Sequence, residues 1–160
     1  MSRLIHKLLL ATLIVLGLQP AAFAQWALMS ETDDYWVAIN FSSIAPTGDN
    51  QYRVWIRQQV KPDSLNKIRE EKFASLKKFF PNKRQNPFAA YSYHMLLEEF
   101  DITNSANRII TCVYYDENGR VIPEGGYDGD GKWHFIVPNS LGESWFRYVK
   151  GVVTGNMPPQ

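Results

Sequence analysis

Cysteine is nearly absent from this chain: Cys112 is the only one. A single cysteine excludes an internal disulfide, so the fold has to rest on its apolar core. Cys112 lies inside the uncharged run 109–115, where apolar surroundings raise the pKa of a thiol. We therefore interpret it as a buried, unreactive side chain, with an intermolecular disulfide as the alternative.

Long apolar runs are also scarce. The longest, residues 8–18, has about 11 residues, well short of the ~20 that a spanning helix needs. Arg3 and Lys7 precede this run, and Ala22 and Ala24 form a small-x-small cleavage site after it. This pattern predicts a secretory signal peptide over residues 1–24, an exported mature protein and no transmembrane segment.

The chain also lacks a large excess of positive or negative charge, and it lacks known catalytic motifs. Removal of residues 1–24 changes the formal net charge from +1 to −1, which gives no reason to expect nucleic acid or a membrane surface as a partner. There is no nucleophile elbow, H-E-x-x-H motif or phosphate loop, and the mature chain has only His94 and His134. Residues 128–131 (DGDG) resemble half of a calcium loop but lack its closing glutamate. We predict no enzyme, no metal and no cofactor.

Aromatic residues, at 14% of the chain, are plentiful and favour a sheet. Residues 109–115 and 120–122 flank Asn118-Gly119, which is a strong hairpin signal, and we expect the first of these strands to be covered on both faces. Further strands are predicted at 26–29, 35–41, 51–60, 91–102 and 133–137, with loops at 42–50 and 123–132. Met95, Leu96 and Leu97 would also suit a helix, but aromatic content and the position before the hairpin favour a strand over 91–102. Arg53, Trp55 and Arg57 share one partly wet face of strand 51–60.

Two helices complete the prediction. Residues 65–80 carry an amphipathic stripe made of Leu65, Ile68, Phe73, Leu76, Phe79 and Phe80. A second helix begins at Ser140, which forms a capping box with Glu143, and ends at Gly151. Its buried face is expected to contain Leu141, Trp145, Tyr148 and Val149.

These elements predict an α+β fold. It consists of a single antiparallel sheet of about six strands, a C-terminal helix packed on the sheet, and a helix inserted between strands three and four. Residues 25–151 form the single domain, and residues 152–160 form a flexible tail.

One cluster has functional content. Lys77, Lys78, Lys83 and Arg84 gather in sequence around Phe79, Phe80 and Phe88. Cations beside exposed aromatic side chains are suited to an anionic partner, such as a sulfated glycan, a phospholipid headgroup or an acidic protein surface. The alternative is a solvated helix end, since cations are also favoured there by the helix dipole.

Several short motifs, in this order, resemble the surface-adhesin protein E family of small exported proteins from Gram-negative bacteria. They are Trp26, the strand 35–40 with Ser43-Ile44, residues 54–56 (VWI), residues 99–101 (EFD), the hairpin 108–119, and residues 133–143 with Trp133, Pro138 and Glu143. The resemblance covers nearly all of the mature chain. It implies an antiparallel sheet with a C-terminal helix, dimer formation, and binding to host matrix proteins such as vitronectin and laminin.

The chain departs from this family in three ways. It lacks the lipid-acceptor cysteine, so we expect a periplasmic or surface protein without a lipid. The family's two other cysteines correspond to Ile102 and to the 148–150 region, which is consistent with loss of one disulfide. The helix 65–80 resembles an insertion. Two functions stay open at this point: an adhesin-type binding module, and a soluble periplasmic protein that binds a small molecule or an envelope component.

Overall fold

The computed structural model describes residues 26–156, so the predicted signal peptide and the last four residues of the predicted tail lie outside the described part. Its elements, in chain order, are β1 (Trp26–Glu31), β2 (Tyr35–Asn40), η1 (Phe41–Ser43), β3 (Ala45–Gly48), β4 (Gln51–Val60), η2 (Pro62–Ser64), α2 (Leu65–Phe79), β5 (Tyr91–Asp101), β6 (Ala106–Asp116), β7 (Val121–Asp128), β8 (His134–Phe135) and α3 (Leu141–Val153).

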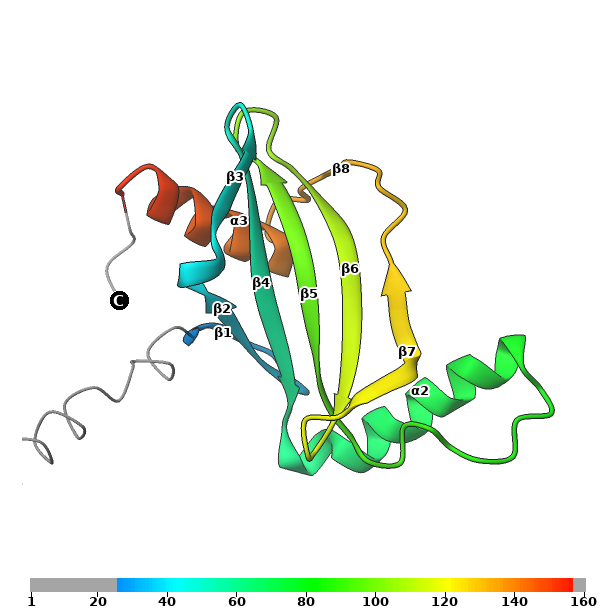
Figure 1. The fold of residues 1–160 in the computed structure, drawn as a ribbon. Helices are drawn as coiled ribbons and strands as arrows, with labels where there is room; N and C mark the ends of the chain where they lie inside the picture. The colour runs from blue at the N-terminus through cyan, green and yellow to red at the C-terminus, as the bar shows by residue number, and fades with distance from the viewer. Residues whose placement is uncertain (1–25, 157–160) are drawn as a thin grey trace, which may run out of the picture.

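One antiparallel sheet organises the molecule (Figure 1). Its main order is β1-β2-β4-β5-β6-β7, with β3 beside the first half of β4 and β8 beside the start of β6. The α+β prediction is confirmed, but the sheet has eight strands rather than about six. The inserted helix therefore lies between the fourth and fifth strands, because β3 forms within the predicted loop 42–50.

The predicted glycine-rich loop is for the most part strand β7. Gly125 lies directly under the Tyr114 ring, where a Cβ would come within 2.0 Å of a ring carbon. Gly129, just past the strand, lies against the backbone of β6, where a Cβ would come within 1.6 Å of the Ile109 carbonyl oxygen. Because glycine has no Cβ, strands β6 and β7 can approach closely here. Glycine is also typical of turns, so the sequence of this segment predicts a loop instead of a strand.

The central hairpin forms as predicted. Tyr115 pairs with Val121, and Gly119 has a φ of 76°, which glycine adopts without strain. The Asp116 carboxylate accepts hydrogen bonds from the backbone N–H groups of Asn118 and Arg120, at 2.8 Å each. Local hydrogen bonding therefore fixes this turn.

The larger core lies between one face of the sheet and α3. It includes Val37, Ile39, Val54, Ile56, Leu96, Phe100 and Cys112 from the sheet, and Trp145, Phe146 and Val149 from the helix. The Ser140 hydroxyl accepts the Glu143 N–H at 3.2 Å, and the Glu143 carboxylate accepts the Asn139 N–H at 2.6 Å, so the predicted helix start is confirmed. Two predictions for this helix are wrong: Leu141 is 45% exposed, and the helix continues through Gly151 to Val153.

A smaller core lies at the other end of the same face, under α2. Its buried members are Val60, Ile68, Phe88, Tyr91 and Ile122. Within α2 only Ile68 is buried, and the second half of the helix extends past β7, away from the sheet (Figure 1). Both helices thus cover the same face of the sheet.

Within residues 26–156, no helix lies on the opposite face of the sheet (Figure 1). The prediction that strand 109–115 is covered on both faces is therefore wrong: apart from Cys112, each residue of that strand is only half-buried. This exposed side, carrying Trp36, Trp55, Tyr93 and Tyr115 among others, is called the open face below.

Candidate binding site

The predicted basic cluster lies where α2 ends. Lys77 and Lys78 occupy the last turn of the helix, and Lys83 and Arg84 lie in the loop that leads back to β5. Because this end of α2 projects from the sheet, all four cations reach the surface, with Lys83 half-buried.

The four cations differ in their partners. Lys83 Nζ lies 3.0 Å from a Glu124 carboxylate oxygen, which lowers the pKa of Glu124. Lys77 Nζ lies 4.5 Å from the centre of the Phe73 ring, a cation–π contact. Within residues 26–156, Lys77, Lys78 and Arg84 have no carboxylate oxygen within ion-pair distance. Three of the four are thus free to meet an external anion.

The aromatic part of the cluster needs one correction. Phe79 and Phe80 are exposed, at 79% and 59%, as a binding patch requires. Phe88 is only 3% exposed and packs edge-on against Tyr91 and Tyr114 in the smaller core. Phe88 is therefore a core residue, because the loop returns to the sheet before β5 begins. The term α2 patch is used below for Lys77, Lys78, Phe79, Phe80 and Arg84.

A cavity of about 460 Å³ adjoins the α2 patch, between α2 and β7. Phe79 belongs to both, so the patch lies at the rim of the cavity. Its apolar lining includes Ile68, Leu76 and Phe88, and its polar lining includes Lys72 and two carboxylates, Glu71 and Glu124, the second of which is paired with Lys83. An apolar pocket with a few polar groups is the usual form of a small-molecule site.

Lys72 is the one lysine in the lining of that cavity. Its Nζ lies 4.0 Å from the centre of the Tyr114 ring and 4.8 Å from that of Tyr91, with no ion pair to a described carboxylate. Burial lowers the pKa of Lys72. The aromatic rings hold the ammonium in place, and a ligand carboxylate or phosphate would gain a partly desolvated ion pair.

Two buried titratable groups on the core face, Cys112 and His94, do not have the pKa values of reactive groups at neutral pH. Burial raises the pKa of the Cys112 thiol to about 11 and lowers the pKa of His94 to about 3, with a smaller effect of Lys72 on each. His94 Nδ1 lies 2.7 Å from the Tyr91 hydroxyl oxygen. Cys112 is therefore a buried thiol and His94 a neutral, hydrogen-bonded imidazole at neutral pH.

The open face carries features that the sequence interpretation missed. Alternation along the strands brings Trp26, Trp36 and Trp55 to this face. Trp133 contacts Arg108 of the same face, with the guanidinium carbon 4.5 Å from the ring centre. Of the chain's five tryptophans, only Trp145 belongs to the core. The signal available in the sequence was the alternation of Arg53, Trp55 and Arg57, which by itself predicts only a partly wet strand face.

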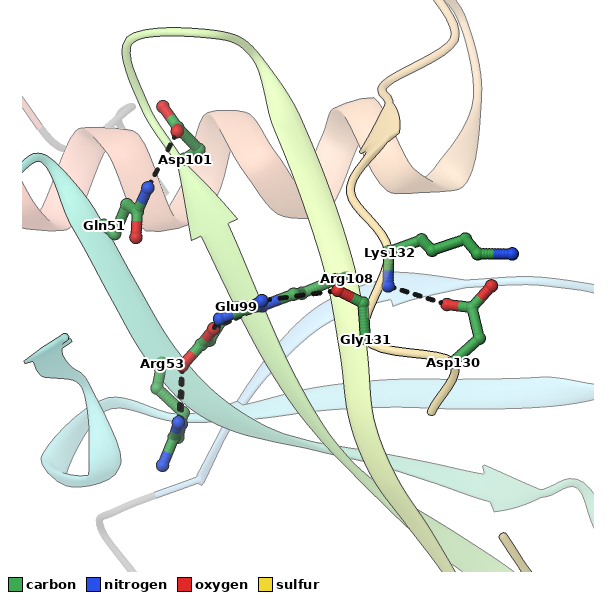
Figure 2. A network of polar contacts seen from close by, with 8 residues as sticks. All are labelled: Gln51, Arg53, Glu99, Asp101, Arg108, Asp130, Gly131 and Lys132. Carbon is green, nitrogen blue, oxygen red and sulfur yellow. Dashed lines mark hydrogen bonds and ion pairs between the residues drawn. The ribbon is translucent and has the colours of Figure 1, made fainter. Parts of the chain in front are cut away.

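Glu99 is the charged centre of the open face (Figure 2). Its carboxylate is 1% exposed and lies 2.5 Å from Arg53 and 2.6 Å from Arg108. Burial alone would raise the pKa of Glu99, but hydrogen bonds from Arg53 and Arg108 together lower it. Arg108 also donates to the Gly131 carbonyl, which attaches the loop before β8 to the sheet (Figure 2).

No family model, curated protein or solved structure matches this chain. The resemblance to surface-adhesin protein E thus stays a prediction.

In the part of the chain from Trp26 to Asn156, no helix is long and apolar enough to cross a membrane, and no three His, Cys, Asp or Glu side chains are grouped to hold a metal ion. Asp130 instead accepts the Lys132 N–H at 2.9 Å (Figure 2).

Proposed function

We propose that this chain is an exported, non-catalytic binding protein of the surface-adhesin E type, which holds an anionic partner at the α2 patch. The partner class is a host extracellular-matrix protein or another polyanion. The observation that carries the proposal is the pair of adjacent exposed side chains, Phe79 and Phe80, flanked by three cations without carboxylate partners. Exposed apolar groups of this size are costly unless a partner covers them.

Immobilised heparin is a suitable first probe for this patch. The variant Lys77→Glu/Lys78→Glu/Arg84→Glu is expected to elute at lower salt than the wild type, because each replaced cation loses an attraction that salt screens. A second variant, Phe79→Ser/Phe80→Ser, is expected to weaken retention while the net charge stays the same. Matrix proteins would then be screened with the same variants.

A matched control is available on other surfaces. Lys132, Arg147 and Lys150 are exposed and lie outside the patch, and their reversal to Glu changes the net charge by the same amount. The proposal predicts that this control keeps most of its retention. Equal loss in the two charge-reversed variants would show a general charge effect and would remove the α2 patch from consideration.

A second candidate function is small-molecule binding in the cavity between α2 and β7. Lys72 favours it, because this lysine lines the cavity without an ion pair to a described residue. The expected ligand is an anion with an apolar body, and anilinonaphthalene sulfonate is a convenient fluorescent probe. Lys72→Met is expected to abolish its saturable binding and Lys132→Met, at an exposed position away from α2, to leave it intact; equal binding by both variants would argue against the cavity.

A further inference from the structure

The open face has a hollow of about 300 Å³ near the β1 side of the sheet, lined by Trp26, Trp36, Ala38, Arg57 and Gln59. Strand register explains the hollow. Ala38 pairs with Arg57, Trp36 pairs with Gln59, and Trp26 pairs with Asn40, two residues along β2 from Ala38. The methyl group of Ala38 thus lies among much larger side chains, and the surface is lower there.

Among the described residues, Arg57 is the only charged one that lines this hollow. Its side chain is held by its neighbours. Its guanidinium carbon lies 4.0 Å from the centre of the Tyr93 ring, which is itself stacked on Tyr115 at 4.8 Å. One Nη donates to the Gln59 side-chain oxygen at 2.6 Å, and the Gln59 amide donates in turn to Ser92. The cation is therefore pre-organised, which reduces the entropy cost of binding.

The guanidinium of Arg57 also has fewer hydrogen-bond acceptors around it than it has N–H groups. Its Nε is buried and has no hydrogen-bond partner, and no described carboxylate lies within ion-pair distance of its guanidinium. The other two arginines of this face, Arg53 and Arg108, are both paired with Glu99. Within residues 26–156, Arg57 thus provides a positive charge without a counterion, and a carboxylate is a group that a guanidinium can bind through two parallel hydrogen bonds.

The two tryptophans of the hollow indicate which chemical group would lie beside the carboxylate of a ligand. Trp36 is 39% exposed and Trp26 is half-buried, so parts of both indoles remain accessible. The negatively charged face of an indole favours the weakly positive C–H groups of a sugar ring. The hollow is at the small end of the range for ligand pockets, which is suitable for one or two rings of a longer chain.

We propose that this hollow binds an acidic sugar residue, of the uronic acid class, within a polysaccharide. The sugar carboxylate meets the Arg57 guanidinium, and the ring lies against Trp36 and Trp26. Gln59 acts as a positioning residue for Arg57. This site is separate from the α2 patch and does not depend on the function proposed there.

Titration with trigalacturonate, followed by tryptophan fluorescence and calorimetry on the protein purified after export, tests the proposal. The fully methyl-esterified trisaccharide keeps the rings and loses the charge, so it is expected to bind at least about tenfold more weakly. This comparison needs no variant of the protein. Saturable binding of the acid, weakened by esterification, is the supporting result.

Two variants locate the binding. Arg57→Gln removes the charge, and Ala38→Leu fills the floor of the hollow while every hydrogen-bonding group stays in place. Each is expected to lower the affinity for trigalacturonate at least about tenfold. Arg147→Gln, on α3 and 73% exposed at its side chain, is the matched control and should bind as the wild type does. Heparin itself contains uronic acid residues, so the α2 patch is followed here on immobilised dextran sulfate, which has none. Retention there should be equal in Arg57→Gln and Arg147→Gln, which lose one positive charge each, so the two proposals fail independently.

Three results would overturn the proposal. The first is equal affinity for the acid and its ester. The second is the absence of saturable binding at about 10 mM sugar, a concentration at which a millimolar dissociation constant is still detectable. The third is full binding by a folded Ala38→Leu variant. A change in oligomeric state on Ala38→Leu substitution, without sugar binding by the wild type, would assign the hollow to a second copy of the chain instead.

Discussion

Glu98 and His94 lie on the core face of β5, separated by Leu96, and both are buried. Burial raises the pKa of Glu98 to about 7, opposed by a hydrogen bond from the Asn107 side chain, and the second carboxylate oxygen has no hydrogen-bond partner. A protonated carboxyl suits this site better than a carboxylate. The two residues therefore affect the pH dependence of stability in opposite directions.

For Glu98, the folded-state pKa lies above the unfolded value of 4.5. The folded protein then binds more protons between pH 4.5 and 7, so the free energy of unfolding falls as the pH rises through this window. For His94, the folded-state pKa of about 3 lies below the unfolded value of 6.5, so stability falls as the pH drops below 6.5. Between pH 4.5 and 6.5 the two slopes cancel.

Glu98→Gln is therefore expected to stabilise the protein at pH 8 and to make it more sensitive to acid. The neutral amide no longer has to be ionised in a buried site, whereas the contribution of His94 is unchanged. Relative to the wild type, the free energy of unfolding should increase by about 2–3 kcal/mol between pH 5 and pH 8. Urea unfolding at a series of pH values measures this difference.

The exposed carboxylate of Glu70 on α2 provides the control. Glu70→Gln should leave the pH profile of unfolding close to that of the wild type. A Glu98→Gln profile parallel to the wild-type profile over the same range would show that Glu98 is ionised in the folded protein.

At the scale of elements, the connection from β7 to β8 depends on one close backbone contact. Gly129 N–H donates to the Ile110 carbonyl at 2.9 Å, which holds this segment against β6. The loop that follows is attached by Arg108, through Gly131 and Trp133. A side chain at position 129 would have to push the two backbones apart.

Gly129→Ala is expected to lower the free energy of unfolding by about 2–4 kcal/mol, in the range of substitutions that force a backbone shift. Gly142→Ala is the matched control, since its Cβ would meet only the Ser140 hydroxyl oxygen, at 3.5 Å, inside a helix. That control should be neutral or slightly stabilising, because alanine favours helix. Thermal melting of both variants measures the difference, and equal melting temperatures would contradict the close contact.

At the scale of the whole molecule, the two faces of the sheet have different roles. One face is covered by α3 and by the first half of α2 and forms the core. The other remains open and carries aromatic and arginine side chains, and the end of α2 projects beyond the sheet (Figure 1). The α2 patch and the hollow at Arg57 thus lie outside the core, where substitutions can change binding without unfolding the protein.

The predicted export can be tested on whole cells. An epitope-tagged full-length chain is expected to lose residues 1–24 and to leave the cytoplasm. If it functions as an adhesin, protease added to intact cells should digest it. Full protection, with release by osmotic shock, would place it in the periplasm and contradict the adhesin proposal. Retention of residues 1–24 on the cytoplasmic protein would contradict export itself.

The local features of this protein were determined by the sequence alone. The Asn118-Gly119 turn, the cap formed by Ser140 and Glu143, and strands β2 and β4 followed from local spacing, because turns, caps and alternation depend on neighbours a few residues away. The position of the α2 patch was predictable for the same reason.

Only the tertiary structure decided which side chains meet. Strand β3, the extension of β7, the burial of Phe88 and the exposure of Leu141 depend on which segments pack together, and local propensity does not report this. The hollow at Arg57 requires β1, β2 and β4 to be in one register, so that residues distant in the sequence surround Ala38. The buried site of Glu98 likewise exists only once the strands and helices have packed together, since burial is a property of the assembled fold.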